Sequence, residues 1–224
     1  MPGLLPAPAV TRLLSSVVRR SVRTGLSGVW LRGPLPPSGG AVLAPSHQSW
    51  WDGYLLRELC LECGQEFHVL MDSAQLARFP YLRRIGALPE HALRPALRAL
   101  ESGAWLVVFP EGRLSHPGSP GPLRPGAGWL ARRAGVPLVP IAVRVALRGQ
   151  QLPEAYLRCG PAVQPEGLAE ALDGLVARQD AELPEGDPEG PPAGYLQLSG
   201  GRRSQSERLD LPGRLLGWLS GERA

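Results

Sequence analysis

Lysine is absent from this chain of 224 residues, because all 24 basic residues are arginine. Without lysine the protein cannot form a Schiff base, and it has no Walker-type lysine to hold a phosphate group. The sequence also lacks a G-x-S-x-G motif, the turn that presents the serine nucleophile of α/β-hydrolases. These absences exclude several classes of enzyme.

Long apolar runs are absent as well. No uninterrupted apolar window reaches the 18 residues that indicate a transmembrane helix. Arginines run through the middle of the N-terminal segment, which therefore lacks the basic, apolar and cleavable order of a signal peptide. We expect a cytoplasmic protein, peripheral on the inner face of the cytoplasmic membrane.

Cysteine is scarce, and three cysteines in a chain of this size do not form a disulfide framework. Cys60 and Cys63 form a single C-x-x-C inside an expected helix, which favours two buried helix positions over a metal or redox site. The histidines show no metal-ligand spacing either. We expect no metal and no cofactor.

Acidic residues are scarce in the first part of the chain. Residues 1–149 contain 17 Arg and 8 acidic residues, a net charge of +9, whereas residues 150–224 contain 7 Arg and 12 acidic residues, a net charge of −5. This imbalance indicates an anionic partner near the N-terminus: lipid headgroups, a phosphorylated substrate or nucleic acid. Aromatic residues make up only 6% of the chain, so we expect no nucleic-acid partner.

The N-terminal residues 1–27 are predicted to form a basic amphipathic helix. At about 100° per residue, five apolar residues share one arc, while Arg12, Arg19 and Arg23 cluster on the opposite side. Such a helix can lie on an anionic membrane surface, with its apolar face in the bilayer interface. The alternative, packing on the protein's own core, stays open.

Residues 28–181 have the pattern of one α/β domain. Short apolar runs bounded by Gly and Pro alternate with helical stretches at residues 49–62, 91–102, 127–134 and 166–181. Such alternation predicts a mostly parallel mixed sheet flanked by helices. The expected strands are GVWLRG, GAVLAPS, EFHVLMD, AWLVVFPEG, PLVPIAVRV and AYLRCG.

The end of the chain differs in composition. Residues 182–204 begin with a stretch rich in Pro, Gly and acidic residues, which predicts a flexible linker. Residues 205–224 are predicted to form a short amphipathic tail, with Trp218 as an interface anchor or a docking residue.

The stretch HQSWWD places His47 and Asp52 five positions apart. In a continuous helix they would lie on different faces, so they can meet only if His47 precedes the helix. Pro45 disfavours helix at the residue before it, which allows a strand-to-helix turn at His47. A carboxylate that holds one imidazole nitrogen leaves the other free to act as a general base. A purely structural pair is the alternative.

The stretch VVFPEGRLS ends a second expected strand in a polar turn. It contains Glu111, Gly112, Arg113 and Ser115. Because ligand sites in open α/β sheets lie at the carboxyl ends of the strands, we expect this turn at the same sheet edge as His47. The planar donor fork of Arg113 is suited to a phosphate or a carboxylate.

Three ordered motifs across residues 28–160 make the chain resemble the glycerolipid acyltransferase family, which includes the 1-acylglycerol-3-phosphate acyltransferases. HQSWWD matches the family's His-x-x-x-x-Asp motif, and FPEG matches its Phe-Pro-Glu-Gly. The stretch GVPLVPIAV, residues 135–143, matches a third block in which a Val-Pro precedes apolar residues and another Pro. The resemblance implies that residues 28–181 have a glycerol-3-phosphate acyltransferase-like fold.

The resemblance also implies a function: transfer of a fatty acyl group from acyl-CoA or acyl carrier protein to a lysophospholipid hydroxyl, with 1-acylglycerol-3-phosphate as the expected acceptor. His47 would remove the hydroxyl proton, and Asp52 would orient His47. Glu111, Gly112, Arg113 and Ser115 would form the acceptor site. Pro137 and Pro140 would help to build the acyl or acceptor site, with a structural role as the alternative.

The sequence departs from the family pattern at two places. Arg113 follows FPEG directly, where the family commonly has Thr-Arg-Ser. The block GALPEHALR lacks an Arg at the expected place, for which Arg83, Arg84 or Arg94 could substitute. These departures keep two alternatives open: an acyltransferase for a non-phosphorylated acceptor such as a glycolipid, pigment or amino-acid lipid, or a non-catalytic lipid-surface protein.

Overall fold

The computed structural model describes residues 7–202. The predicted C-terminal tail, residues 205–224, lies outside the described residues. Among residues 7–202, no helix combines the length and the apolar composition needed to cross a bilayer.

One mixed sheet forms the centre of the protein, with strand order β4-β3-β5-β2-β6-β7-β1-β8. Its pairs are parallel from β4 through β6 and between β7 and β1, and antiparallel between β6 and β7 and between β1 and β8. The strands are β1 (Gly28–Arg32), β2 (Ala41–Pro45), β3 (Phe67–Met71), β4 (Ala87–Pro89), β5 (Trp105–Val107), β6 (Leu138–Ala146), β7 (Glu154–Cys159) and β8 (Leu196–Gly200). The predicted mostly parallel mixed sheet is confirmed.

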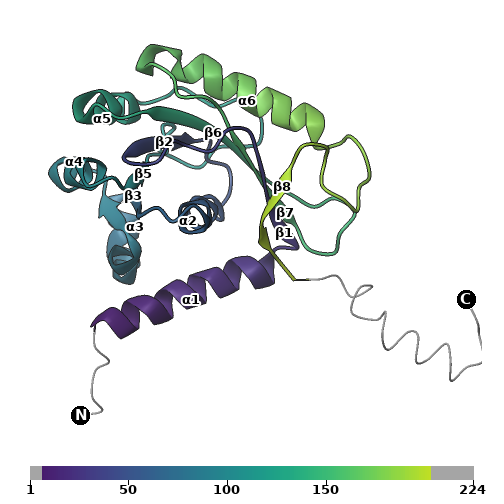
Figure 1. Ribbon diagram of the computed structural model, residues 1–224, viewed down its shortest axis with the longest axis horizontal. Helices are drawn as coiled ribbons and strands as arrows, with labels where there is room; N and C mark the ends of the chain where they lie inside the picture. The colour runs from purple at the N-terminus through teal and green to yellow at the C-terminus, as the bar shows by residue number, and fades with distance from the viewer. Residues whose placement is uncertain (1–6, 203–224) are drawn as a thin grey trace, which may run out of the picture.

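Helices cover both faces of the sheet (Figure 1), with α1 and α2 on one side and α4, α5 and α6 on the other. The helices are α1 (Ala7–Gly25), α2 (Asp52–Glu62), α3 (Ser73–Arg78), α4 (Leu93–Glu101), α5 (Gly126–Ala134) and α6 (Leu168–Glu182), with short 3-10 turns η1 (Pro80–Ile85) and η2 (Pro165–Gly167). All four helices expected in residues 28–181 are present.

Strand β2 is buried on both faces, as its continuous apolar sequence predicts. Ala41 and Leu43 face the core under α2, while Val42 and Ala44 face the core under α4 and α5. Because β2 lies between β5 and β6, the turn that follows it emerges beside the ends of both neighbours. The central position of β2 therefore places His47 next to the turn after β5.

The N-terminal helix α1 packs on α2 and η1 rather than standing apart from the domain. Val18 and Val22 are buried, and the Arg19 guanidinium forms ion pairs with Glu58 and Glu62 of α2. Arg19 therefore points toward the domain, whereas Arg12 and Arg23 are exposed. The alternative that α1 packs on the protein's own core is therefore confirmed for the face that carries Val18 and Val22.

The predicted flexible linker, residues 182–204, is wrong for the part that forms β8. This strand pairs antiparallel with β1, at the edge of the sheet. The preceding segment is held as well, because the Arg148 guanidinium donates to the backbone carbonyls of Asp187 (3.0 Å) and Gly190 (2.6 Å). The Pro-, Gly- and acid-rich stretch before β8 suggested a flexible segment. Composition alone does not show that the edge of β1 needs a strand partner.

Candidate active site

The turn between β2 and α2 brings His47 and Asp52 together. Ser46 continues the hydrogen bonding of β2 to β6, because its N–H donates to Ile141 (3.0 Å) and its hydroxyl accepts the N–H of Val143 (3.0 Å). His47 is the first residue beyond this anchor, and Asp52 begins α2. The His47 Nδ1 and Asp52 Oδ2 atoms are 2.9 Å apart, which confirms the predicted contact.

The Asp52 carboxylate is buried and organises the whole turn. Besides contacting His47, its Oδ2 accepts the backbone N–H groups of Gln48 (2.8 Å) and Ser49 (2.9 Å). Because a carboxylate can only accept hydrogen bonds, this arrangement assigns the proton of a neutral imidazole to Nδ1. The other ring nitrogen, Nε2, is then an acceptor available to a substrate.

The imidazole of His47 is packed on one face, and its side chain is partly exposed. Its ring stacks on Phe109, with ring centroids 3.9 Å apart and an interplanar angle of 25°. The His47 side chain keeps 22% of its surface exposed, whereas Asp52 keeps 1%. A base that is held from behind and reachable from solvent is suited to proton abstraction.

Glu111 joins the turn after β2 to the turn after β5. Its Oε1 accepts the N–H of His47 at 2.9 Å, and its Oε2 accepts the Ser115 hydroxyl. Ser115 in turn donates its N–H to the His47 carbonyl at 2.8 Å. The side chains of Glu111 and Ser115 therefore hold the His47 turn, and their predicted contact with the acceptor stays a prediction.

Gly112 adopts a left-handed backbone conformation, with φ +65°, that favours glycine. A Cβ at this position would lie 2.7 Å from the Nε atom of Arg124. The guanidinium of Arg124 therefore lies directly over the turn that contains Glu111, and Arg113 follows Gly112 in the chain. Arg113 and Arg124 are both exposed.

Sequence reasoning missed Arg124 as a residue of this site. The candidates Arg83 and Arg84 lie in η1 and Arg94 in α4, and within residues 7–202 none of them hydrogen-bonds to the His47 or Glu111 turns. No local pattern identifies Arg124, because it reaches Gly112 through a loop of irregular structure.

Arg144, on β6, is another residue that sequence reasoning missed. Its guanidinium forms two hydrogen bonds with Asp180 of α6, at 2.6 and 2.8 Å, and a third with the carbonyl of Gly118 at 3.3 Å. Gln48 donates to the same carbonyl at 3.0 Å. Arg144 and Gln48 thus tie the loop of residues 113–125 to the site. A charged residue inside the buried strand sequence IAVRV was the available signal.

Pro137 lies just before β6 and Pro140 near its start, in the segment that pairs with β2. The carbonyl of Pro137 accepts the N–H of Val42, near the start of β2, and Pro140 pairs with Ala44. His47 is five residues beyond Val42, which corresponds to roughly 16 Å along a strand. Both prolines take part in the pairing of β6 with β2, which is consistent with the structural alternative; their part in an acyl or acceptor site stays a prediction.

The three cysteines are free thiols, and Cys60 and Cys159 are buried in the core. Within residues 7–202, no group of three or more His, Cys, Asp or Glu side chains could hold a metal ion. Burial raises the pKa of the Cys159 thiol to about 12 and also raises the pKa of the Cys60 thiol. Cys60 in α2 and Cys159 in β7 are therefore packing residues.

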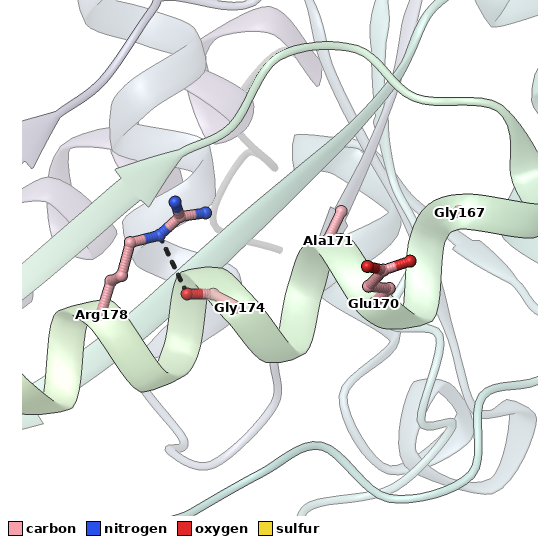
Figure 2. Close-up of a pocket in the computed structure, with 5 residues that line it drawn as sticks. All are labelled: Gly167, Glu170, Ala171, Gly174 and Arg178. Atoms are coloured by element: carbon pink, nitrogen blue, oxygen red, sulfur yellow. Dashed lines mark hydrogen bonds between the residues drawn. The ribbon is translucent and has the colours of Figure 1, made fainter.

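A shallow hollow lies on the surface of α6 (Figure 2), lined by Gly167, Glu170, Ala171, Gly174 and Arg178. The Arg178 guanidinium folds back onto the carbonyl of Gly174 at 3.1 Å. None of these residues belongs to the His47, Glu111 or Arg124 turns. The hollow is therefore separate from the candidate active site.

The chain matches one family model and is similar to a solved structure. A family model described as Acyltransferase matches residues 29–144, more than half of the chain. The chain is also similar to the crystal structure of the 1-acyl-sn-glycerophosphate (LPA) acyltransferase PlsC from Thermotoga maritima. That match has a TM-score of 0.52 and 22% sequence identity, and it covers 77% of this chain and 78% of the other. At this identity the structural match demonstrates a common fold.

Proposed function

The chain belongs to the acyltransferase family, and we propose that this enzyme transfers a fatty acyl group from a thioester donor to the hydroxyl of a lysophospholipid. The donor in this proposal is acyl-CoA or acyl carrier protein. The acceptor is 1-acylglycerol-3-phosphate, and the product belongs to phospholipid biosynthesis.

One observation carries the proposal: the Asp52 carboxylate contacts Nδ1 of His47 at 2.9 Å, and the His47 side chain keeps 22% of its surface exposed. A histidine held in this way can accept a proton at Nε2 without changing orientation. The hydrogen bond from the His47 N–H to Glu111 also fixes the backbone that carries the ring. The geometry therefore supports general-base catalysis.

The proposed reaction needs no covalent enzyme intermediate. Nε2 of His47 accepts the acceptor's hydroxyl proton as the hydroxyl oxygen attacks the thioester carbonyl carbon. The tetrahedral intermediate then collapses, the carbon–sulfur bond breaks, and the departing thiolate takes the proton back from Nε2. The products are an ester and a free thiol, and His47 returns to its starting state.

Two features support a phosphorylated acceptor. Arg113 lies at the turn that is hydrogen-bonded to His47, and a guanidinium binds phosphate through paired donors. The structurally similar PlsC is named for acylation of 1-acyl-sn-glycerophosphate. A monoester phosphate near His47 would place the neighbouring acceptor hydroxyl within reach of Nε2.

We also propose that the enzyme works as a peripheral protein on the inner face of the cytoplasmic membrane. Leu13 and Val17 lie one turn apart on α1 and are 57% and 51% exposed. Arg12, Arg20 and Arg23 on the same helix are exposed as well. An exposed apolar line beside arginines is suited to the interface of an anionic bilayer, from which a lysophospholipid would be supplied.

The test of the proposed function uses purified protein, labelled acyl-CoA and a panel of lyso-acceptors. We expect product with 1-acylglycerol-3-phosphate, and a decrease of about 10²- to 10⁴-fold in kcat for His47→Ala and for Asp52→Asn. His91→Ala is the matched control, because His91 is exposed and its imidazole contacts only Ser73 among the side-chain hydrogen bonds of residues 7–202.

Two results would contradict parts of this proposal. Equal product from the wild type and His47→Ala would remove the proposed base. Failure with every phosphorylated acceptor, together with activity on a glycolipid, pigment or amino-acid lipid, would assign the same machinery to a non-phosphorylated acceptor.

A further inference from the structure

The turn after β5 carries a second arginine whose position is set by the backbone. The N–H of Arg124 donates to the carbonyl of Pro110 at 2.7 Å, so the end of the loop is fastened to the start of the same turn. The Arg124 side chain then lies over Gly112, where a Cβ would come within 2.7 to 2.9 Å of its Nε, Cζ and Cδ atoms. Arg124 is 12 residues beyond Gly112 but part of the same surface.

The positive charge of this surface is not compensated by the protein. Arg113 and Arg124 are exposed, and neither side chain has an ion pair with an acidic residue within residues 7–202. The adjacent acid, Glu111, is buried and directs its oxygens to the His47 N–H, the Ser115 hydroxyl and the Gly121 N–H. Two guanidinium groups around one glycine therefore remain available to an external anion.

Arg113 and Arg124 belong to the turn that is hydrogen-bonded to the backbone of the proposed base, His47. Gly112 directly follows Glu111, whose carboxylate is hydrogen-bonded to the backbone of His47. An anion held over Gly112 would therefore belong to the same small molecule that presents its hydroxyl to the His47 imidazole. Helix α5 begins two residues after Arg124, without an acidic residue in its first turn, and its N-terminal dipole adds to the positive potential.

We propose that Arg124 is a specificity-determining residue that binds the phosphate monoester of the acceptor together with Arg113. It would supply the second guanidinium in place of the Arg that the block GALPEHALR lacks at the expected position. This inference rests on the proposed function, because it assumes that the acceptor is phosphorylated. It also accounts for glycine at position 112, since any side chain there would displace the Arg124 guanidinium.

The test measures acceptor selectivity in Arg124→Ala, Arg124→Lys and the control Arg133→Ala. Arg133 is exposed at the opposite end of α5. For Arg124→Ala we expect the KM for 1-acylglycerol-3-phosphate to rise about 10- to 100-fold with little change in kcat. The ratio of kcat/KM values for this acceptor over monoacylglycerol should fall by the same factor. Arg124→Lys should be intermediate, because an ammonium keeps the charge but loses the planar fork.

The outcomes separate this inference from the proposed function. If the wild type acylates 1-acylglycerol-3-phosphate and Arg124→Ala leaves the selectivity ratio unchanged, the role of Arg124 is overturned alone. If the wild type acylates no lysophospholipid, the proposed function fails. Calorimetric titration with sn-glycerol 3-phosphate then decides the case: equal binding by wild type and Arg124→Ala overturns the inference, and loss of binding supports a phosphate site.

Discussion

The side chain of Glu111 accepts a hydrogen bond from the backbone N–H of His47 at 2.9 Å, although 64 positions separate the two residues. The bond crosses from the turn after β5 to the turn after β2, two parallel neighbours in the sheet. Glu111 thus controls the position of the proposed base without contacting its ring.

Replacement of Glu111 by Gln tests this positioning role. The amide keeps one acceptor but puts an NH₂ group where the carboxylate accepts hydrogen bonds from a hydroxyl and backbone N–H groups. We expect kcat to fall about 10-fold or more and unfolding free energy to fall by about 1–3 kcal/mol, the cost of mismatched buried polar groups. Steady-state kinetics measures kcat, and urea unfolding measures the free energy of unfolding. An unchanged kcat with a raised acceptor KM would instead indicate direct contact with substrate.

Gly112→Ala should couple a loss of stability to a change in substrate binding. Its positive φ costs an L-residue roughly 1–2 kcal/mol, and the new methyl group would collide with the Arg124 guanidinium. We expect a lower melting temperature and a higher KM for the phosphorylated acceptor. Gly126→Ala is the control, since nothing lies within 4 Å of its Cβ position and φ is not positive. Similar kinetics for both variants would argue against the contact with Arg124.

The double variant Leu13→Gln/Val17→Gln should weaken binding to anionic vesicles. Each exposed apolar side chain that enters the interface contributes up to roughly 1.5–3 kcal/mol, so removal of two predicts at least a 10-fold weaker association. Co-sedimentation with anionic vesicles measures this association. Deletion of α1 would be a poor test, because Val18 and Val22 are buried against the domain. Leu147→Gln/Leu196→Gln provides the control, as these exposed residues lie elsewhere; equal weakening by both pairs would refute a specific role for α1.

The thiols should differ in reactivity with iodoacetamide. Burial raises the pKa of Cys159 to about 12 and raises the pKa of Cys60, while partial burial and Glu62 raise the pKa of Cys63. A raised pKa lowers the fraction of reactive thiolate at pH 8. We expect Cys63, the most accessible, to react first in the native protein, and the other two only after unfolding. Mass spectrometry of the labelled peptides would reveal any comparable labelling of Cys60 in the native state.

Local sequence was sufficient to predict the elements that surround the site. Continuous apolar runs predicted β2, β5 and β6, because a strand buried on both faces needs no polar alternation. Pro45 and the spacing of His47 and Asp52 predicted the turn, since only a break before the helix allows contact over five residues. The rule that ligand sites lie at the carboxyl ends of parallel strands then predicted that the FPEG turn would be adjacent.

Other parts of the protein depended on partners distant in sequence. Strand β8 follows a segment of linker-like composition and pairs with the edge of β1. Arg124 reaches the site because an irregular loop returns its backbone to Pro110, and Arg19 turns inward because Glu58 is available on α2. The sequence by itself determined six of the eight strands in residues 7–202 and the His47–Asp52 turn, because hydrophobic periodicity and proline act over a few residues. Only the tertiary structure decided which charges meet, because hydrogen bonds and ion pairs depend on the three-dimensional positions of both partners.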